Sequence, residues 1–339
     1  MTILKLGEIY KVLAQLGLKK SQVKSLLPDW WDDEVGQTEL GVWEFALIVA
    51  RRLSIDANAL LQGNISMIGS VTKIAFKHRS TISSDAYLAS SMMVASLSEA
   101  INAASANPFK SFKSSALELR SHIREMNGGV IDFNGLLDFC WANGLPVIPL
   151  PNLPIGIRKM DGAIFYSGSR PAIVISRKND SKAWLSFILA HEIGHYCLSH
   201  LEPGGSIIDA DLKGDLTSQA ESSNDDQERE ADQFALDLLG GPEAEQAISV
   251  WNPRSTGVSL AVNARNDAPG AGSAAGHLVL RHAFRTKRWA ESQAALNFLD
   301  EDFDAQDYLV AKLKSQIDLD LIAEDLQSMV CSITGMQHD

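Results

Sequence analysis

The sequence contains little cysteine. Only Cys140, Cys197 and Cys331 occur among its 339 residues, and they lie far apart. An odd number of widely spaced cysteines argues against a disulfide framework and against a thiolate zinc cluster. Because reduced thiols are typical of cytosolic proteins, the cysteine content fits a cytoplasmic location.

Positive charge and long apolar runs are also scarce. The chain has 30 lysines and arginines against 42 aspartates and glutamates, a formal net charge of -12. This balance argues against a general electrostatic grip on nucleic acid, although it leaves room for a local basic patch. No apolar run reaches the roughly 18 residues of a membrane helix, and Lys5, Glu8 and Lys11 interrupt the N-terminus, which does not read as a signal peptide. We expect a cytoplasmic protein that does not bind membranes.

What remains is the composition of an ordinary globular protein, with 45% hydrophobic and 21% charged residues. A chain of this length is expected to form two or three domains. The patterning predicts a helical module over residues 1–65, a region of helices and strands over residues 84–245, and a helical C-terminal region over residues 277–339. Residues 66–83 are expected to form a linker or short hairpin. Residues 253–276, rich in glycine, alanine, asparagine and serine, are expected to form a flexible connection.

The N-terminal region, residues 1–65, contains helical apolar stripes, and Thr38 is a candidate N-cap for its longest helix. The apolar residues expected on one side of that helix are Val42, Trp43, Ala46, Leu47, Ala50 and Leu53. The segment Ala50–Gly63 is similar to the last helices of phage-repressor helix-turn-helix domains, so a degenerate module of that kind is one interpretation. Residues 28–50, however, hold six acids and no base. A protein-docking or structural module is therefore favoured over DNA binding.

The middle of the chain alternates between helical and strand patterns. Helices are predicted at about 84–106, 114–126 and 132–143, the last with Asp132 as its cap. Strands are predicted at 145–150, 163–166 and 172–176. A further helix, capped by Asp180 or Ser181, runs into the sequence HEIGH, and another contains EREAD and stops at Gly240. Together these elements predict an α+β fold with a small sheet.

The sequence His191-Glu192-Ile193-Gly194-His195 is an H-E-x-x-H motif. On a helix, positions i and i+4 lie one turn apart on the same face, so both imidazoles can reach one ion, and neutral imidazole is a good zinc ligand. Glu192 is the candidate catalytic base, placed to take a proton from water that attacks a carbonyl. The preceding WLSFILA segment is almost wholly apolar, and polar side chains on a buried helix are costly without a metal or partners. The motif therefore predicts Zn2+ bound by His191 and His195.

A catalytic zinc needs a third protein ligand and an open fourth position. A third histidine in the H-E-x-x-H-x-x-G-x-x-H arrangement would fall at Leu201, and the glycine of that arrangement at Leu198, so this class of site is rejected. His200 misses the register by one residue and is interpreted as an ordinary polar residue near the helix end. A glutamate from a later helix is the alternative.

That glutamate is expected within Glu228-Arg229-Glu230-Ala231-Asp232. The E-x-x-A-D pattern resembles the second motif of glutamate-type zincins. The resemblance implies that Glu228 is the third zinc ligand and that Asp232, on the same helical face, orients a ligand histidine through its free ring nitrogen. Glu230 lies elsewhere on the helix and is the weaker choice of ligand. For this stretch taken alone, an acidic and solvated helix start is the alternative.

Together, FILAHEIGHYCLSH (187–200) and EREADQFALDLLGGP (228–242) resemble the ImmA/IrrE family of bacterial and phage metallopeptidases. DGAIFYSGSRPAIVIS (161–176) is similar to the strand pair that precedes the zinc helix in that family. The resemblance covers about residues 132–242 and implies a zincin-like catalytic domain with a small sheet, flanked by helical N- and C-terminal regions. One departure is the long acidic gap between the two motifs, residues 202–227, which is expected to gate the cleft or to contact a basic substrate.

Members of that family are typically cytoplasmic and act on helix-turn-helix repressors. The resemblance therefore implies a zinc metalloendopeptidase that cleaves or inactivates a repressor or antitoxin in stress, prophage or toxin–antitoxin control. The alternative belongs to a different class. It is a regulatory or DNA-binding protein with a structural zinc site, which acts by sequestering its partner or through residues 1–65.

Other residues are weaker candidates. Those considered for stabilising an oxyanion are Tyr166, His277 and His282, and each is more often structural. Cys197, two residues after the second histidine of the motif, is interpreted as a small core residue. Trp30 and Trp31 are expected either to form an exposed docking patch or to pack in the core.

Overall fold

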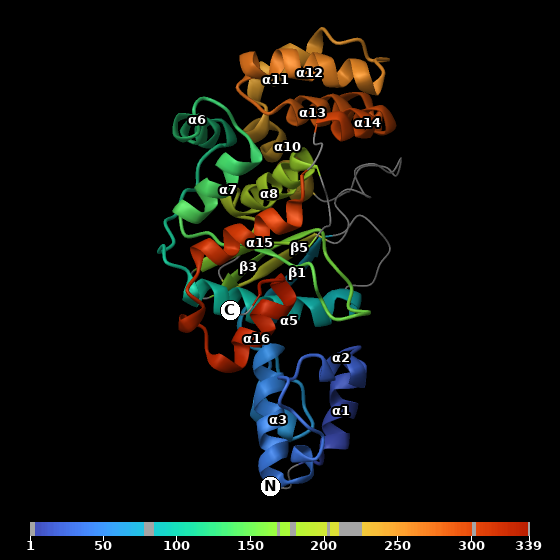
Figure 1. Cartoon of the computed structure of the whole chain (residues 1–339), viewed down its shortest axis with the longest axis vertical. Coiled ribbons are helices and arrows are strands. Elements are labelled where there is room, and N and C mark those ends of the chain that lie inside the picture. Colours follow the sequence, from blue (N-terminus) through green and yellow to red (C-terminus); the bar gives the residue numbers. More distant parts are fainter. Residues whose placement is uncertain are drawn as a thin grey trace.

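The chain folds into an α+β structure in which one mixed sheet lies between helices (Figure 1). A computed structural model describes residues 4–77, 85–167, 170–176, 181–201, 204–209, 226–299 and 303–337. The strands are β1 (Ile74–Lys77), β2 (Val147–Pro149), β3 (Gly162–Ser167), β4 (Arg170–Ile175) and β5 (Ser206–Asp209). Their order is β1-β5-β3-β4-β2, with β3 antiparallel to both neighbours and the outer pairs parallel. The predicted α+β class is confirmed.

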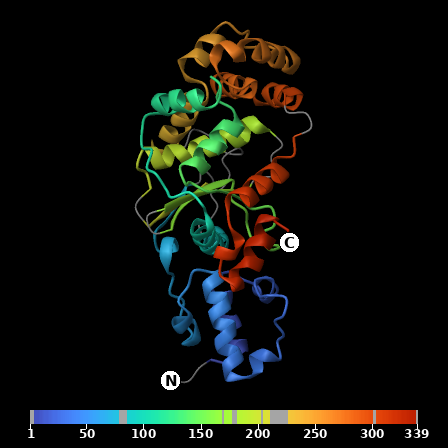
Figure 2. The same cartoon turned by 60° about the vertical axis from the view of Figure 1, so that its left-hand side comes forward.

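Helices cover both faces of the sheet. On one face α5 (Asp85–Ala104) packs against β3 and β4, and on the other face α8 (Lys182–Cys197) packs against the same strands (Figure 1 and Figure 2). The helix α10 (Asp226–Leu239) lies along α8, and α6 (Ala116–Met126) and α7 (Phe133–Ala142) pack beside them. Among the residues described, no helix is long and apolar enough to span a membrane.

Predicted caps begin several of these helices. Asp132 accepts a hydrogen bond from the Gly135 N–H at 2.8 Å and starts α7, as expected. Ser181, one of the two candidates for the cap of α8, accepts from the Trp184 N–H at 3.4 Å. Asp180 lies outside the described residues.

The N-terminal module occupies one end of the molecule (Figure 1 and Figure 2). Its elements are α1 (Leu6–Ala14), α2 (Lys20–Lys24), the short 3-10 helix η1 (Val35–Gln37), α3 (Glu39–Arg52) and α4 (Ala57–Leu61). Thr38 caps α3 as predicted, because its Oγ1 accepts from the Gly41 N–H at 3.0 Å. Between this module and α5, the expected linker region contains η2 (Gly69–Lys73) and strand β1.

The predicted core face of α3 was wrong at two positions. Trp43 and Leu47 point outward and are exposed, while Phe45 is fully buried. The reason is the position of α1, whose Tyr10 ring lies 5.1 Å from the Phe45 ring between centroids and so draws that side of the helix into the core.

A buried arginine joins the module to the last helix, α16 (Glu324–Thr334). The Arg52 guanidinium, at the end of α3, donates to the backbone carbonyls of Leu26 and Asp325 and, at 2.9 Å, to the Ser328 hydroxyl. Residues from two distant parts of the chain therefore share one cation, which holds the module against the body of the protein.

Residues 253–276 do not form a flexible connection, so that prediction was wrong. Gly257–Ala271 is a helix, α12, whose buried residues are Leu260, Ala261, Ala264, Ala268 and Ala271. A Cβ atom at Gly257 would lie 2.7 Å from the Ala294 side chain of α14 (Trp289–Leu299). The small residues that resemble a linker in the sequence instead let two helices pack closely.

The C-terminal helices divide into two groups. At the end opposite the N-terminal module, α11 (Gly241–Ser249) and α13 (Ala275–Thr286) pack with α12 and α14 (Figure 1). The chain then returns toward the sheet, where α15 (Ala305–Gln316) lies beside β2. The last helix, α16, follows η3 (Leu319–Leu321) and packs against α5 and α3. One connected hydrophobic core includes residues from all three predicted domains, and the domain boundaries stay a prediction.

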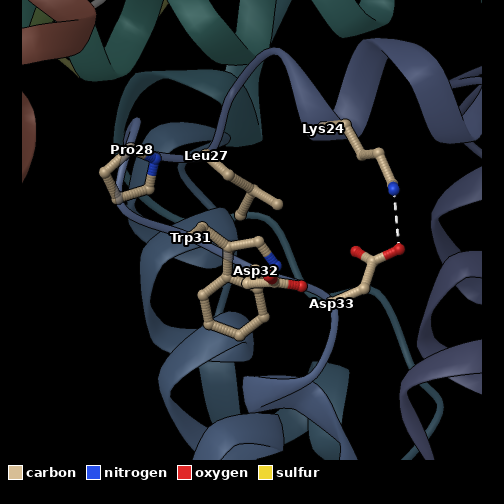
Figure 3. A pocket seen from close by; sticks show the side chains of 6 residues that line it. All are labelled: Lys24, Leu27, Pro28, Trp31, Asp32 and Asp33. Atoms are coloured by element: carbon tan, nitrogen blue, oxygen red, sulfur yellow. Dashed lines mark hydrogen bonds and ion pairs between the residues drawn. The ribbon is translucent and has the colours of Figure 1, made fainter.

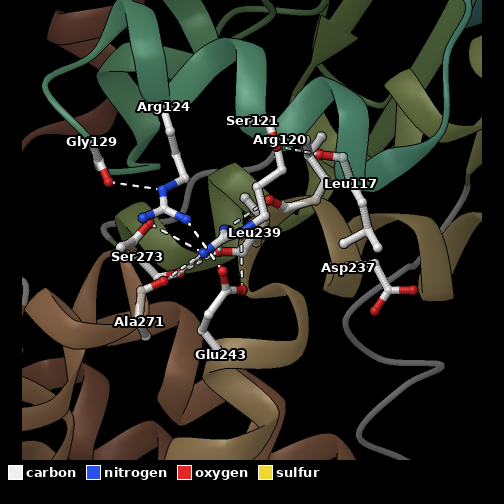
Figure 4. A network of polar contacts seen from close by, with 12 residues as sticks. Leu117, Arg120, Ser121, Arg124, Gly129, Asp237, Leu239, Glu243, Ala271 and Ser273 are labelled. Atoms are coloured by element: carbon white, nitrogen blue, oxygen red, sulfur yellow. Dashed lines mark hydrogen bonds and ion pairs between the residues drawn. The ribbon is translucent and has the colours of Figure 1, made fainter.

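A polar network on α6 fixes the ends of α10 and α12 (Figure 4). The buried Arg120 side chain donates to the carbonyls of Leu239 at 2.9 Å and Ala271 at 2.6 Å, and to the Ser273 hydroxyl at 3.1 Å. The carbonyl groups in the last turn of a helix receive no hydrogen bond from within the helix. An arginine between two helix ends can therefore donate hydrogen bonds to several of these carbonyls at once.

Candidate metal centre

Helix α8 is buried along almost its whole length. Ser181 caps it, and every residue from 183 to 196 is buried. A helix that is apolar around its circumference suits such a core position, with the sheet on one side and α10 and α13 on others. Within this apolar surround, His191, Glu192 and His195 are each 0% exposed.

Three potential ligand atoms converge between α8 and α10. The Nε2 atoms of His191 and His195 are 3.0 Å apart. The Glu228 carboxylate of α10, which is 3% exposed, lies 3.6 Å from His191 Nε2 and 3.4 Å from His195 Nε2. Ligands at about 2.1 Å from a tetrahedral ion are about 3.4 Å from one another. These distances fit that geometry, so His191, His195 and Glu228 could hold a metal ion.

A glycine inside the motif allows α10 to reach this position. The Gly194 Cα faces Phe234 of α10, and a Cβ atom there would lie 3.2 Å from the Phe234 Cβ. A side chain at residue 194 would therefore require Phe234 to give way by a few tenths of an ångström. Because Glu228 and Phe234 share α10, the separation of the helices sets how close the carboxylate comes to both histidines.

The electrostatics of the group also favour a cation. Burial alone would raise the pKa of Glu228, but hydrogen bonding and charge from His191 and His195 lower that pKa below its ordinary value. The carboxyl is therefore ionised, as a metal ligand must be. A divalent cation in the site would also compensate the charge of the buried carboxylate.

Each histidine of the group also has a polar partner on its other ring nitrogen. His191 Nδ1 lies 3.0 Å from the Asp232 carboxylate of α10. His195 Nδ1 lies 3.0 Å from His200 Nδ1, and His200 Nε2 lies 2.9 Å from the Glu230 carboxylate. Asp232 therefore contacts His191, whereas Glu230 contacts His200 and is not among the three converging ligand atoms.

His200 lies near the end of α8, as interpreted, but it also contacts His195, and the way the helix ends explains this contact. Ser199 has φ +62°, a left-handed conformation that costs a non-glycine residue roughly 1 kcal/mol. The His200 N–H then bonds to the His195 carbonyl and the Ser199 N–H to the Tyr196 carbonyl, the Schellman pattern of a helix end. Because the chain reverses direction here, the His200 side chain packs against His195. The spacing of a motif along a continuous helix could not predict this contact.

Glu192 lies against the sheet. A Cβ atom on Gly162 of β3 would collide with the Glu192 Oε1 atom, and it would also lie 2.9 Å from the Ile188 side chain. The absence of a side chain at residue 162 therefore leaves the space that the carboxyl occupies. The role of Glu192 as catalytic base stays a prediction.

The weaker candidates lie in other surroundings. The pKa of His277 is lowered to about 3, first by burial and then by the charge of Arg120. His282 packs against Trp251, with ring centroids 5.6 Å apart. The backbone N–H of Tyr166 bonds to the Gly205 carbonyl at 2.9 Å. These contacts give no support to an oxyanion role, which stays a prediction.

Cys197 fits its interpretation as a small residue of the core. Its side chain packs against the hydrophobic core, and Sγ lies 4.0 Å from the Phe112 carbonyl. Burial raises the pKa of the thiol to about 11, so Cys197 is an unreactive thiol.

The two adjacent tryptophans differ. Trp30 is 59% exposed, whereas Trp31 packs against Phe45 with ring centroids 5.5 Å apart. Trp31 also borders a pocket of about 350 Å³, whose other lining residues are Lys24, Leu27, Pro28, Asp32 and Asp33 (Figure 3). The Lys24 ammonium donates to the Asp33 carboxylate at 2.6 Å, so these two charges compensate each other.

No protein-family model matches the chain, and no curated protein matches its sequence.

The acidic segment between the motifs falls largely outside the described residues, which include only 204–209 and 226–227 of the region 202–227. The expectation that this segment gates a cleft or contacts a basic substrate therefore stays a prediction.

Proposed function

We propose that the chain is a zinc metalloendopeptidase of the glutamate-zincin type, similar to the ImmA/IrrE family. In this proposal His191, His195 and Glu228 hold Zn2+, and Glu192 is the catalytic base. The observation that carries the proposal is the buried convergence of two imidazoles and one carboxylate, with a glutamate directly after the first histidine. Two histidines with one glutamate are a donor set of catalytic zinc sites, whereas structural zinc sites are rich in thiolate.

The proposed reaction assigns the proton transfers to Glu192. A zinc ion held by His191, His195 and Glu228 would polarise the substrate carbonyl and acidify water. Glu192 accepts a proton from the water molecule as its oxygen bonds to the carbonyl carbon. The peptide C–N bond then breaks, and Glu192 gives the proton to the departing nitrogen. The products are a carboxylic acid and an amine, and the Glu192 carboxylate is restored.

The proposed substrate is a cytoplasmic protein, a helix-turn-helix repressor or an antitoxin. Two features support this: the resemblance of residues 132–242 to a family that acts on repressors, and the repressor-like helices of residues 50–63. Direct DNA binding by the N-terminal module is the weaker alternative, because residues 28–50 hold six acids and no base.

A non-proteolytic regulator with a structural zinc site is the second candidate. It is favoured by one observation, the complete burial of His191, Glu192 and His195. A catalytic site needs a path for substrate, whereas a structural site does not. In this case the protein would sequester its partner instead of cutting it.

The substitution Glu192→Gln separates the two candidates. The full-length protein, loaded with zinc, is incubated with a degenerate peptide mixture, and cleavage products are identified by mass spectrometry. We expect the wild-type protein to cut peptides, and Glu192→Gln to bind zinc equally well but to lose cleavage. The matched control is Glu125→Gln, which changes an exposed glutamate of α6. Wild-type cleavage by Glu192→Gln would overturn the proposed mechanism. Zinc binding with no cleavage by the wild type would favour the sequestering regulator.

A further inference from the structure

We propose that His200 and Glu230 are positioning residues that orient the metal ligand His195. This inference rests on the proposed metal site and extends it outward. His200 Nδ1 lies 3.0 Å from His195 Nδ1, and Glu230 Oε2 lies 2.9 Å from His200 Nε2. The His200 side chain is 5% exposed, whereas that of Glu230 is 60% exposed. The chain of contacts therefore runs from the buried ligand to the protein surface.

The hydrogen bonds can be assigned from the requirement of the ligand. For His195 to offer the Nε2 lone pair to a cation, its Nδ1 must carry the proton and donate it to an acceptor. His200 Nδ1 is that acceptor, so the proton of His200 is on Nε2 and is donated to the Glu230 carboxylate. Each member of the chain then has one arrangement, which fixes both the tautomer and the ring plane of His195.

The same task is performed differently for the other ligand histidine. His191 Nδ1 reaches the Asp232 carboxylate directly at 3.0 Å. His195 lies one helical turn further along α8, at its end, where the chain turns back through Ser199. The imidazole of His200 therefore stands next to His195 in the position that a carboxylate has next to His191. The negative charge comes from Glu230, which contacts His200 on its far side. The two arrangements form a matched pair within one site.

The test measures metal affinity in the full-length protein without substrate. Zinc affinity is measured by competition with a chromophoric chelator, and the visible spectrum of bound Co2+ reports ligand geometry. We expect His200→Ala to weaken zinc affinity by about 10- to 100-fold and to change the Co2+ spectrum. Glu230→Gln, at an exposed position, is expected to have a smaller effect of the same sign. His200→Gln should restore most of the affinity, because its amide can accept from His195 and donate to Glu230.

The controls are His122→Ala and Glu125→Gln, which remove an exposed histidine and an exposed acid from α6. Both should bind zinc as the wild type does. The proposal is overturned if a folded His200→Ala or Glu230→Gln variant keeps wild-type affinity and spectrum. It is also overturned if His200→Gln is as weak as His200→Ala, since the role would then be packing alone. A wild-type protein that binds no zinc would instead refute the metal site itself, so the two failures can be told apart.

A separate observation concerns the outward face of α3. Leu40, Trp43 and Leu47 are 78%, 37% and 54% exposed, and they follow one another at spacings of three and four residues. Single exposed apolar residues are ordinary, but three in helical register form a stripe of the kind that packs against another helix. One turn beyond Leu47, Arg51 pairs with Asp325 of α16 at 2.7 Å. The end of the stripe is thus fixed against the body of the protein.

From this stripe we infer a docking surface for a basic amphipathic helix of another protein. The charge beside it selects the occupant, because Glu39 and Glu44, which flank the stripe on α3 itself, are both acidic and exposed. A second copy of the chain would bring the same negative charges to the interface, which is unfavourable. A helix with apolar residues at the same spacing and lysines or arginines beside them would complement both the stripe and its border.

The probe for this surface is a synthetic amphipathic peptide, as long as α3, with a leucine stripe bordered by lysines. Binding to the full-length protein is followed by fluorescence anisotropy. We expect this peptide to bind at least about tenfold more tightly than a scrambled peptide of the same composition, or one with glutamate in place of lysine. Replacing Leu40, Trp43 and Leu47 together with serine should remove the difference.

The matched control is Val258→Ser with Val262→Ser, which removes two exposed apolar residues, 57% and 50% exposed, from α12. It should leave binding unchanged. Equal binding of the scrambled peptide, or unchanged binding by the triple serine variant, would refute the docking surface. Sedimentation velocity tests the remaining occupant: a wild-type dimer that the triple variant converts to monomer would show that a second copy covers the stripe. None of these outcomes depends on zinc or on peptide cleavage.

Discussion

At the metal centre, polar and charged side chains are completely buried, while on the outer face of α3, large apolar side chains are exposed. Each arrangement is unfavourable by itself, because buried charge loses its hydration and exposed apolar surface orders water. Each could therefore accept a partner of the opposite character: a cation at His191, His195 and Glu228, and, as proposed above, a macromolecular surface at Leu40, Trp43 and Leu47. Departures from the normal pattern of burial therefore point to candidate sites that composition alone does not reveal.

The largest expected effect is the loss of the cation site. In the wild type, zinc at a thousand times its dissociation constant should stabilise the fold by about 4 kcal/mol. Glu228→Ala removes one of the three proposed ligands, so we expect zinc affinity to fall by more than about 100-fold and this stabilisation to fall below about 1.4 kcal/mol at the same zinc concentration. Denaturant unfolding with and without zinc measures both. If Glu228→Ala were stabilised by zinc as much as the wild type, Glu228 would not be a ligand.

The next effect tests whether the two regions are mechanically joined. Arg52→Met removes the buried guanidinium that connects Leu26 with Asp325 and Ser328. We expect a loss of about 3 kcal/mol in the free energy of unfolding, since several charge-assisted hydrogen bonds are lost, while zinc affinity stays within about twofold. Arg51→Met is the matched control. Its exposed pair with Asp325 should contribute at most about 1 kcal/mol. A large change in zinc affinity would show that the module and the metal site are coupled.

A comparable effect on rate is expected next to Glu192. In Gly162→Ala the new Cβ atom meets the Glu192 carboxyl, which must move. Under the proposed mechanism, displacing the base by about 1 Å lowers kcat/KM by about 100-fold, while zinc affinity is unchanged because no ligand moves. Gly270→Ala is the control, since a Cβ atom at that helical position has open space around it. Equal activity of Gly162→Ala and the wild type would count against the assigned position of the base.

The pair of histidines in the candidate metal centre could be predicted from the sequence, because helix periodicity alone places His191 beside His195. The resemblance of EREAD to a known second motif then supplied Glu228, and cap residues such as Asp132 and Ser181 marked helix starts through local hydrogen bonds. Each of these sequence patterns lies within a short stretch of the chain, so it can be recognised without knowledge of the tertiary structure.

The remainder depended on tertiary structure. The contact of His200 with His195 requires the left-handed turn at Ser199, which a non-glycine residue seldom adopts. The identification of residues 253–276 as a linker failed because close packing of α12 against α14 selects the same small residues that flexible segments contain. The outward turn of Trp43 depends on where α1 packs. Propensity cannot supply any of these placements.

The smallest expected effect concerns a buried polar group outside the metal centre. Burial, and then the nearby Arg120 charge, lowers the pKa of His277 from 6.5 to about 3. Between these values the unfolded chain binds a proton that the folded chain does not, so the folded state loses stability as pH falls below about 6.5. From about pH 7 to about pH 5 the loss from His277 is about 2 kcal/mol, at about 1.4 kcal/mol per pH unit below the unfolded pKa.

Metal-free protein is used for this measurement, so that zinc release does not contribute. Denaturant unfolding at each pH compares the wild type with His277→Gln, whose stability should fall less between the two pH values by about 2 kcal/mol. The exposed His122→Gln is the control and should follow the wild type. If His277→Gln lost stability as steeply as the wild type, His277 would not be held neutral by burial. A buried histidine that the fold keeps neutral with no ion would show that burial alone does not mark a metal ligand, and that convergence with other donors, as at His191 and His195, is the deciding feature.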